Sequence, residues 1–325
     1  MGNDVFFLAE FADGRAQRSA LELAAGAAQL AAGSGGQAVA LAYGRGAATG
    51  AAALGAQGAA RAVVLGDENR PAITFAASAA AVARDGLLLL APATPNGRDI
   101  GAAVVGILNV PAFGPVSGLA IDGSNVRTTQ ATLQGSVVTV STTVDGARGP
   151  SVVLVLANTF TPEEGGSGSA ELSDAPPVDD DPFASVRVVE SHAEQKAAVN
   201  LEEASVIVAG GRGVGSADGF AQLHALAAVL GGAVGASRAA ADAGWVPYQL
   251  QIGQTGKVVK PSLYLGCGIS GAIQHRVGMQ TAENVVAINK DPDAPIGEFA
   301  DLYVVGDLFQ IVPRLTEEIE RRRVQ

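Results

Sequence analysis

The chain has 325 residues, which is long enough for two domains of ordinary size. Hydrophobic residues make up 48% and charged residues 16%, a balance that supports a substantial core and excludes disorder of the whole chain. The net charge of −11 and isoelectric point near 4.7 argue against binding the phosphates of nucleic acid, and the single cysteine, Cys267, excludes an intrachain disulfide and a cysteine-held metal or iron–sulfur centre.

The apolar runs are short. The run Leu87–Ala91, for example, is far below the roughly 20 residues that a membrane helix needs. The first residues also lack the basic and apolar regions of a secretory signal. We therefore expect a protein that does not span a membrane and that is located in the cytoplasm.

The first 160 residues alternate short apolar runs with alanine-rich segments, which predicts a mostly parallel sheet covered by helices. The apolar runs have the length of strands buried on both faces. Strands are predicted at Val5–Ala9, Ala38–Tyr43, Ala62–Leu65 and Leu87–Ala91. Helices are predicted at Arg18–Ala32, Ala47–Gln57 and Pro71–Arg84.

From Val116 onward the pattern changes to strands separated by turns. Asp122-Gly123 and Asp145-Gly146 are turn signals. The strand-like segments are Val116–Ile121, Val137–Val144 and Val152–Leu156. We expect antiparallel additions to the sheet here.

Residues 161–184 have a different composition. Up to Asp181 they hold seven acidic residues, no Lys or Arg, and many Gly, Ser and Pro. Such sequence buries little apolar surface, so an extended or mobile surface connector is predicted.

After the connector the α/β pattern returns. Val186–Val189 is one possible strand, and a closing helix is predicted from about Pro313, which suits a first helical turn. Further strands are predicted at Ser205–Ala209, Ser262–Leu265, Val285–Ile288 and Leu302–Val305, with helices at Gly219–Leu230 and Gly271–Met279. The sequence predicts an α/β fold of two domains, 1–190 and 191–325, each a mostly parallel sheet flanked by helices, the second Rossmann-like.

Glycine-rich or polar segments follow the strands of the second domain. Ligands bind beyond the carboxyl ends of parallel strands, where glycine lets the backbone approach a phosphate. The segment Gly266–Gly271 matches G-x-G-x-x-G, and Asp291 lies 20 residues after its last glycine. The residues alone therefore predict a nicotinamide dinucleotide site with Asp291 on the adenosine ribose, although the match lies on an internal strand. An NAD-binding oxidoreductase subunit stays open as an alternative.

Several motifs in order resemble the electron transfer flavoprotein α-subunit family over roughly residues 204–315. They are Gly210-Gly211-Arg212-Gly213, Gly235-Ala236-Ser237-Arg238, the segment from Gln251 to Lys257, the segment from Leu263 to His275, Gly278-Met279, the segment from Val286 to Pro292, and Gly306-Asp307-Leu308-Phe309. Gly266-Cys267 and Ala282 depart from the usual residues and are conservative in size. The first domain is similar only in strand order and in its acidic connector.

The resemblance implies one FAD bound to the second domain. It places Thr255 near flavin N5, Arg238 over the isoalloxazine ring and His275 at the C2 carbonyl side. The ribityl–pyrophosphate region would be served by Arg212, Ser270 and Gln274, and the adenosine half by Asn289 and Asp307. The implied cofactor-binding residues in full are Arg212, Ser237, Arg238, Gln251, Gln254, Thr255, Gly268, Ser270, Gly271, Gln274, His275, Asn289, Asp307 and Leu308.

The resemblance also implies an electron carrier in place of a substrate-converting enzyme. Its partners would be an electron transfer flavoprotein β subunit in a heterodimer, donor dehydrogenases such as those of fatty acid β-oxidation (or NADH in a bifurcating variant), and an acceptor such as a quinone oxidoreductase. Outside that context the residues have plainer interpretations. Arg238 suits an ion pair with Asp242 on one helical face, Cys267 a small buried filler, and His192 and His224 no functional role.

Overall fold

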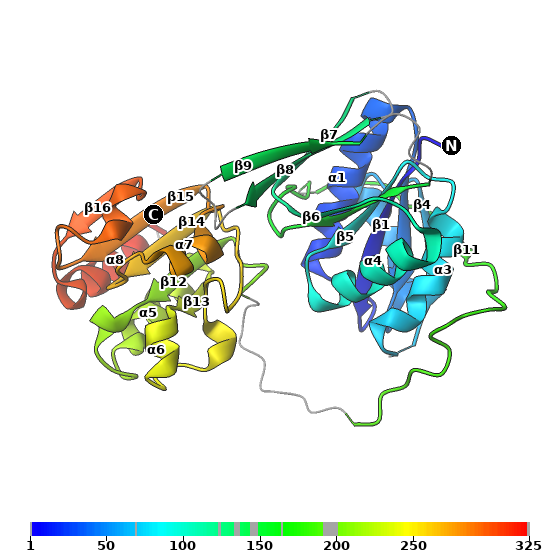
Figure 1. Cartoon of the computed structure of the whole chain (residues 1–325). Coiled ribbons are helices and arrows are strands. Elements are labelled where there is room, and N and C mark those ends of the chain that lie inside the picture. The colour runs from blue at the N-terminus through cyan, green and yellow to red at the C-terminus, as the bar shows by residue number, and fades with distance from the viewer. Residues whose placement is uncertain are drawn as a thin grey trace. The chain divides into compact units, whose positions relative to one another are not determined.

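The computed structural model of the chain describes residues 2–68, 70–122, 125–132, 137–143, 149–163, 165–190 and 201–323. The chain divides into two compact units, Met1–Gln130 with Val138–His192, and Ala193–Gln325 with Ala131–Val137. Each unit is an α/β structure, as the sequence predicts (Figure 1). The domain boundaries 1–190 and 191–325 remain a proposal.

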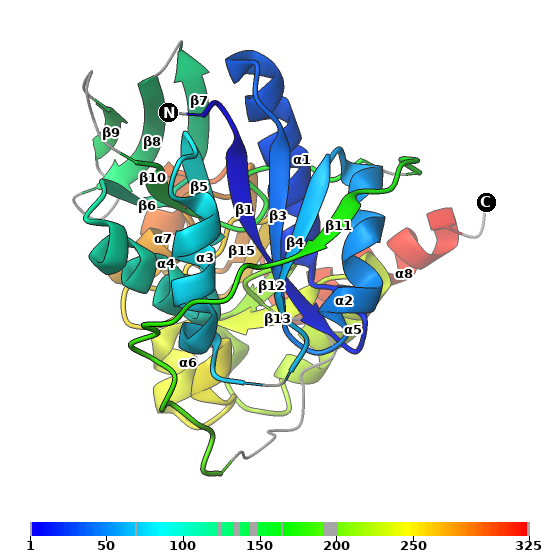
Figure 2. The same cartoon turned by 90° about the vertical axis from the view of Figure 1, so that its right-hand side faces the viewer.

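The first unit is built on one large sheet whose strand order is β11-β4-β3-β1-β5-β10-β6. Neighbouring strands along this order run parallel, and Figure 2 shows β1, β3, β4 and β11 side by side. The strands are β1 Val5–Ala12, β3 Ala38–Tyr43, β4 Arg61–Gly66, β5 Leu88–Pro92, β6 Ala112–Val116, β10 Ser151–Val155 and β11 Glu171–Asp174, with β2 Arg15–Ala16 antiparallel to β1.

Both faces of this sheet are covered because its strands are apolar on both sides. Val5, Phe7 and Ala9 of β1 pack against α1 on one face, while Phe6 and Leu8 pack against α3 and α4 on the other. The helices are α1 Arg18–Ser34, α2 Ala47–Gly50, α3 Ala76–Ala83 and α4 Pro95–Leu108, with 3-10 turns η1 Ala51–Gln57 and η2 Ala72–Phe75. Alanines in the helices allow this close approach to the sheet.

Three sequence predictions in this unit are wrong. β10 and β6 join the main sheet as parallel strands, while β7 Gly118–Asp122, β8 Asn125–Thr132 and β9 Val137–Thr142 form a separate three-stranded sheet in which β7 and β8 run antiparallel. The acidic connector contains β11, which pairs with β4 through its backbone and therefore needs no apolar side chains. Val186–Val189 forms no strand, and its valines are exposed. Gly123 and the turn at Asp145-Gly146 lie outside the described residues.

The second unit holds a five-stranded parallel sheet of order β13-β12-β14-β15-β16. Its strands are β12 Val206–Gly210, β13 Ala233–Ala236, β14 Leu263–Cys267, β15 Asn284–Asn289 and β16 Leu302–Val305. The chain therefore winds outward in one direction from β12 to β13, then crosses back to β14 and continues on the other side. This is the doubly wound order 2-1-3-4-5, in which ligands bind where the winding reverses, between the first and third strands.

Helices cover the faces of this second sheet. Residues on one face of β12 and β14 pack against α5, α6 and α8, and Tyr264 on the opposite face packs toward Met279 of α7. The helices are α5 Phe220–Leu230, α6 Arg238–Asp242, α7 Ile273–Met279 and α8 Leu308–Arg323, with 3-10 turns η4 Arg212–Val214, η5 Tyr248–Leu250 and η6 Pro295–Glu298. Among the described residues, no helix has both the length and the apolar character needed to cross a membrane.

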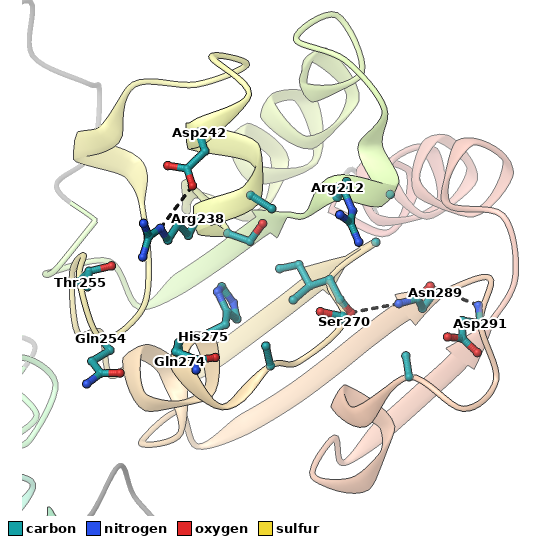
Figure 3. A pocket seen from close by; sticks show the side chains of 17 residues that line it. Arg212, Arg238, Asp242, Gln254, Thr255, Ser270, Gln274, His275, Asn289 and Asp291 are labelled. Atoms are coloured by element: carbon teal, nitrogen blue, oxygen red, sulfur yellow. Dashed lines mark hydrogen bonds and ion pairs between the residues drawn. The ribbon is translucent and has the colours of Figure 1, made fainter.

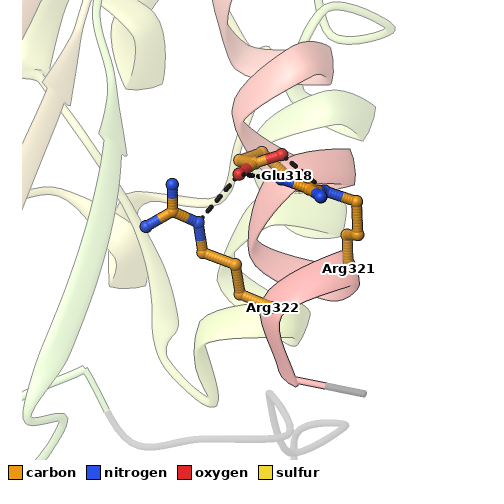
Figure 4. A network of polar contacts seen from close by, with 3 residues as sticks. All are labelled: Glu318, Arg321 and Arg322. Atoms are coloured by element: carbon orange, nitrogen blue, oxygen red, sulfur yellow. Dashed lines mark hydrogen bonds and ion pairs between the residues drawn. The ribbon is translucent and has the colours of Figure 1, made fainter. Parts of the chain in front are cut away.

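The closing helix α8 corrects one prediction. It begins at Leu308, five residues before Pro313, because a carboxylate oxygen of Asp307 accepts the backbone N–H of Phe309 and so starts the helix. Its last turn is exposed. There Arg321 and Arg322 both donate to Glu318, at 2.7 and 2.8 Å (Figure 4).

Candidate functional site

A cavity of about 800 Å³ lies in the second unit at the carboxyl ends of its strands. Its walls come from the segments that follow four neighbouring strands: Arg212 after β12, Ser237 and Arg238 after β13, the loop from Gly268 to His275 after β14, and Asn289 after β15. This is the point where the winding of the sheet reverses, so the fold itself places the cavity. Figure 3 shows Gln254 and Thr255 at one end and Asn289 and Asp291 at the other.

The cavity brings together ten of the fourteen residues that the sequence marks as cofactor-binding. They are Arg212, Ser237, Arg238, Gln254, Thr255, Gly268, Ser270, Gln274, His275 and Asn289. The other four do not line it. Their direct contact with a ligand stays a prediction, and the structure gives each a local supporting role.

Gln251 is buried and donates from Nε2 to the hydroxyl of Thr255 at 2.9 Å, so it orients a lining residue. Leu308 is buried beneath the glycine loop, where its Cδ2 would meet a Cβ on Gly268 at 3.1 Å. The carboxylate of Asp307 caps α8 and pairs with Lys290 at 3.2 Å. The backbone N–H of Phe309 and the Lys290 ammonium both lower the pKa of that carboxyl.

The fourth residue, Gly271, shapes the turn before α7. Its φ of +83° lies in the left-handed region that favours glycine, and a Cβ there would approach the backbone nitrogen of Ile296 to 2.4 Å. A side chain at this position would therefore be strained and would also displace a neighbouring backbone segment.

Two glycine loops at the cavity floor pack backbone against backbone. A Cβ on Gly211 would lie 2.3 Å from the carbonyl oxygen of Gly268, and a Cβ on Gly213 would lie 2.7 Å from its Cα. The N–H of Gly213 donates to that same carbonyl at 3.0 Å. Both loops therefore need glycine in order to lie this close to one another at the end of the sheet.

Two buried polar atoms of residues that line the cavity, the hydroxyl of Ser237 and Nδ1 of His275, have no hydrogen-bond partner among the described residues. Ser237 stands at the N-cap of α6, where a serine oxygen usually accepts a backbone N–H, yet it makes no such bond. Buried polar groups without partners are uncommon and destabilising. Both atoms are therefore placed to bond to a molecule in the cavity.

The imidazole of His275 is held neutral. Burial lowers its pKa to about 4, and the backbone carbonyl of Ile252 opposes that shift. Its Nε2 lies 2.6 Å from the hydroxyl of Tyr264, which is fully buried. Burial also raises the pKa of the Tyr264 hydroxyl well above its ordinary value, so the hydroxyl keeps its proton.

Two arginines supply positive charge to the cavity. Arg238 pairs with Asp242 at 3.3 Å, the i,i+4 ion pair that the sequence suggests, and Asp242 also accepts from the Tyr248 hydroxyl at 3.0 Å. Both members of the ion pair are about half exposed or more, at 67% and 48% of their side chains, so the pair is weak and separable. The guanidinium of Arg212 makes no hydrogen bond or ion pair with any residue that the structure describes.

At the other end of the cavity, Asn289 donates to the carbonyl of Ile269 at 3.0 Å and accepts the N–H of Asp291 at 3.2 Å. It therefore ties the glycine loop to the end of β15. Asp291, the residue that the nicotinamide prediction uses, also lines the cavity, and one of its carboxylate oxygens accepts the N–H of Asp293 at 3.0 Å.

Comparison with known proteins identifies the family. The Electron transfer flavoprotein domain model matches residues 5–181, more than half of the chain, and the Electron transfer flavoprotein FAD-binding domain model matches residues 200–280. The electron transfer flavoprotein subunit alpha of Mycobacterium leprae is 42% identical over 259 residues, which cover 78% of this chain and 77% of that protein.

The chain belongs to the electron transfer flavoprotein α-subunit family. The Clostridium acetobutylicum subunit alpha is 37% identical over 72% of this chain and 70% of its own length. The Thermoanaerobacterium thermosaccharolyticum subunit alpha is 61% identical over 128 residues, which span only 39% of each protein. The chain thus spans well under two thirds of that relative.

Within this electron transfer flavoprotein α subunit, the segment matching the FAD-binding model includes Arg212, Arg238, Thr255 and His275. The polar groups of the cavity suit a flavin dinucleotide: two arginines, two buried polar atoms without a partner among the described residues, and glycine loops that let the backbone approach a ligand. Over the described parts of the chain, His, Cys, Asp and Glu side chains do not gather into a metal-binding group.

Two residues that matter here were not among the predicted site residues. Asp242 lines the cavity and holds Arg238, and its i,i+4 spacing was the available signal. Tyr264 lies on β14 beneath the cavity, and no sequence pattern pairs it with His275.

Cys267 is buried, which raises its pKa to about 12, so it is a filler as expected. His224 is exposed, and His192 lies outside the described residues.

Proposed function

We propose that this α subunit binds one FAD in the cavity of its second domain and carries electrons through it. The observation that carries the proposal is the pair of buried, unpartnered polar atoms, Ser237 Oγ and His275 Nδ1, on the wall of a cavity that also holds two arginines. The family model for the FAD-binding domain covers all four of these residues.

When bound, FAD supplies a ring that takes up and releases electrons one or two at a time. Arg238 stabilises the negative charge that reduction adds to the ring, because its guanidinium lines the cavity that the ring occupies. The hydroxyl of Thr255 and the ring of His275 orient the isoalloxazine. The neutral imidazole contributes a hydrogen bond and adds no charge.

The rest of the cofactor lies along the strand ends in this proposal. The guanidinium of Arg212 and the N–H groups of the loop that follows Gly268 bind the pyrophosphate, with Ser270 and Gln274 at the ribityl side; the N–H of Gly268 itself donates to the carbonyl of Ile288. Asn289 and Asp291 face the adenosine half. Helix α7 has seven residues, so the loop and Arg212, more than a helix dipole, hold the phosphates.

The carrier acts in the cytoplasm as a heterodimer with an electron transfer flavoprotein β subunit. It accepts electrons from dehydrogenases, including those of fatty acid β-oxidation, or from NADH in a bifurcating variant, and delivers them to an acceptor such as a quinone oxidoreductase. The relatives' printed name, electron transfer flavoprotein subunit alpha, supports the carrier role and the presence of a second subunit; the donors, the acceptor and the compartment follow from the family resemblance alone.

Purification of the full chain with its β subunit tests the cofactor. We expect a yellow complex that releases FAD on denaturation, in a ratio of about one per α subunit. A colourless complex that instead binds NAD would overturn the proposal and favour the nicotinamide site at Gly266–Gly271 and Asp291. A colourless complex that binds neither would indicate an assembly subunit without a cofactor.

Substitution of Arg238 tests the role of the charge. Arg238→Ala should lower the first reduction potential of the bound flavin, because the negative charge gained on reduction loses its nearest cation. Arg238→Lys keeps the charge and is the matched control, with a smaller shift expected. Potentials are measured by titration with a reductant in the presence of reference dyes. An unchanged potential in Arg238→Ala would show that Arg238 does not stabilise the negative charge of the reduced flavin.

A further inference from the structure

Tyr264 and His275 form a buried hydrogen-bonded pair at the base of the cavity. Tyr264 lies on β14 with none of its surface exposed, and His275, in the first turn of α7, is 7% exposed. The hydroxyl and Nε2 are 2.6 Å apart, and the two rings are tilted by 59°. Only His275 reaches the cavity, so Tyr264 can affect a ligand only through the imidazole.

The direction of this hydrogen bond follows from the needs of both groups. A buried hydroxyl has one proton to donate, and for Tyr264 the structure offers no acceptor other than Nε2 among the described residues. If Nε2 carried a proton instead, the Tyr264 proton would be buried without a partner, which is unfavourable by roughly 1–3 kcal/mol. The hydroxyl therefore donates, and Nε2 accepts.

A neutral imidazole that accepts at Nε2 carries its proton at Nδ1. The carbonyl of Ile252, the group that raises the pKa of His275, also favours a ring proton. Since Nε2 already accepts the hydrogen bond from the Tyr264 hydroxyl, the ring proton that this carbonyl favours is carried by Nδ1. That carbonyl raises the pKa of the imidazole without forming a hydrogen bond to Nδ1, which has no partner among the described residues. The result is one N–H donor, fixed in direction, on a lining side chain.

We propose that Tyr264 is a positioning residue for the flavin site: by donating to Nε2 it fixes His275 as the Nδ1–H tautomer and so presents a single donor to a carbonyl oxygen of the bound isoalloxazine. This inference rests on the proposed function, because the acceptor is a flavin atom. The tautomer itself is a property of the chain and is measurable without the cofactor.

The fixed tautomer matters because reduction adds electron density to the acceptor side of the ring. A donor that is already oriented strengthens its hydrogen bond on reduction with no reorganisation. A ring free to exchange tautomers would present a lone pair part of the time, and a lone pair repels a carbonyl oxygen. Tyr264 therefore stabilises the reduced form of the flavin indirectly, through its hydrogen bond to His275.

The direct test is the nitrogen NMR spectrum of the full chain labelled with ¹⁵N-histidine, recorded without cofactor and then with FAD and the β subunit bound. His275→Gln identifies the signals of His275. We expect the Nδ1–H pattern in both states at neutral pH. An Nε2–H pattern in the FAD-free chain would overturn the proposal whatever the cofactor proves to be. A colourless complex with the Nδ1–H pattern would reject the flavin proposal alone.

Tyr264→Phe tests the consequence, because it removes the hydroxyl and keeps the ring that fills the core. We expect a mixed or reversed tautomer and about a tenfold loss in the equilibrium constant for uptake of the first electron, which is 59 mV for one electron. In a His275→Gln background the same change should have little further effect. Equal shifts in both backgrounds would show that Tyr264 acts by packing alone and would overturn the proposal.

Tyr43→Phe is the matched control. Tyr43 is also buried and its hydroxyl also donates to one side chain, Glu10, at 3.3 Å, but it belongs to the first unit. Its loss should leave the tautomer and the potential unchanged. The fluorescence of Trp245, the only tryptophan in the sequence, verifies that each variant keeps a folded second domain.

Discussion

The neutral state of His275 predicts a loss of stability in mild acid. The pKa of this imidazole is 6.5 in an unfolded chain and about 4 in the folded protein, because burial disfavours the charged form. Between pH 6.5 and pH 4 this imidazole is mostly protonated in the unfolded chain and mostly neutral in the folded chain. The contribution of His275 to stability is therefore complete above pH 6.5 and is lost as the pH falls toward 4.

The size of this effect follows from linkage. Between pH 7 and pH 5 the two pKa values of His275 give a loss of about 2 kcal/mol in the free energy of unfolding. Carboxylates also titrate in acid, so the quantity to compare is the difference between two variants. His275→Gln keeps an acceptor for the Tyr264 hydroxyl and does not titrate, so it should lack this part of the loss.

The assay is urea unfolding of the cofactor-free chain at pH 7 and pH 5, followed by the fluorescence of Trp245, which packs in the core of the same unit. Without cofactor, differences in ligand binding do not enter the result. His224→Gln is the matched control, since its imidazole is exposed and should leave the wild-type loss intact. If the wild type and His275→Gln lose the same free energy of unfolding between the two pH values, the prediction that His275 is buried in its neutral form is wrong.

Further substitutions test the cavity floor and its charges. Gly271→Ala should destabilise the second unit by roughly 2–4 kcal/mol in the same assay, because φ is +83° and a backbone atom lies 2.4 Å from the added Cβ. Gly215→Ala is its control: φ is +81° with open space, so only about 1 kcal/mol is expected, and equal losses would refute the steric argument. Arg212→Ala should weaken retention of FAD about tenfold or more in equilibrium dialysis without changing the flavin potential, and unchanged retention would remove it from the phosphate site. Asp242→Asn should raise the first reduction potential, since it leaves Arg238 without a competing anion; a lowered potential would show that the ion pair instead holds Arg238 in place.

The fold was largely predictable from the sequence because strands buried on both faces are continuous apolar runs. β3, whose six residues are all buried, spans Ala38–Tyr43 as predicted. β16 is more exposed but is still apolar, and it spans Leu302–Val305 as predicted. β11 escaped prediction because its side chains are all exposed and only its backbone pairs with β4. An apolar pattern reveals a strand only when its side chains are buried, and β11, at the edge of the sheet, has no buried side chain.

A position at the cavity could be predicted from the sequence where a residue lies just after a strand, while cofactor binding by these residues stays a prediction. Arg212 and the loop from Gly268 have such positions, and the topology brings them to one cavity. Prediction failed where a contact depends on the angle between elements. The contact between Tyr264 and His275 depends on the orientation of α7 over β14, which the sequence does not show. Asp307 caps α8 five residues before the start that Pro313 predicts.

The contact between the two glycine loops couples three positions that are far apart in the sequence. Because Gly211 and Gly213 lie against Gly268, a side chain gained at any one of them forces the opposite loop to move away. Such a displacement would change the floor of the cavity from both sides, so a substitution in one loop acts on the ligand also through the other.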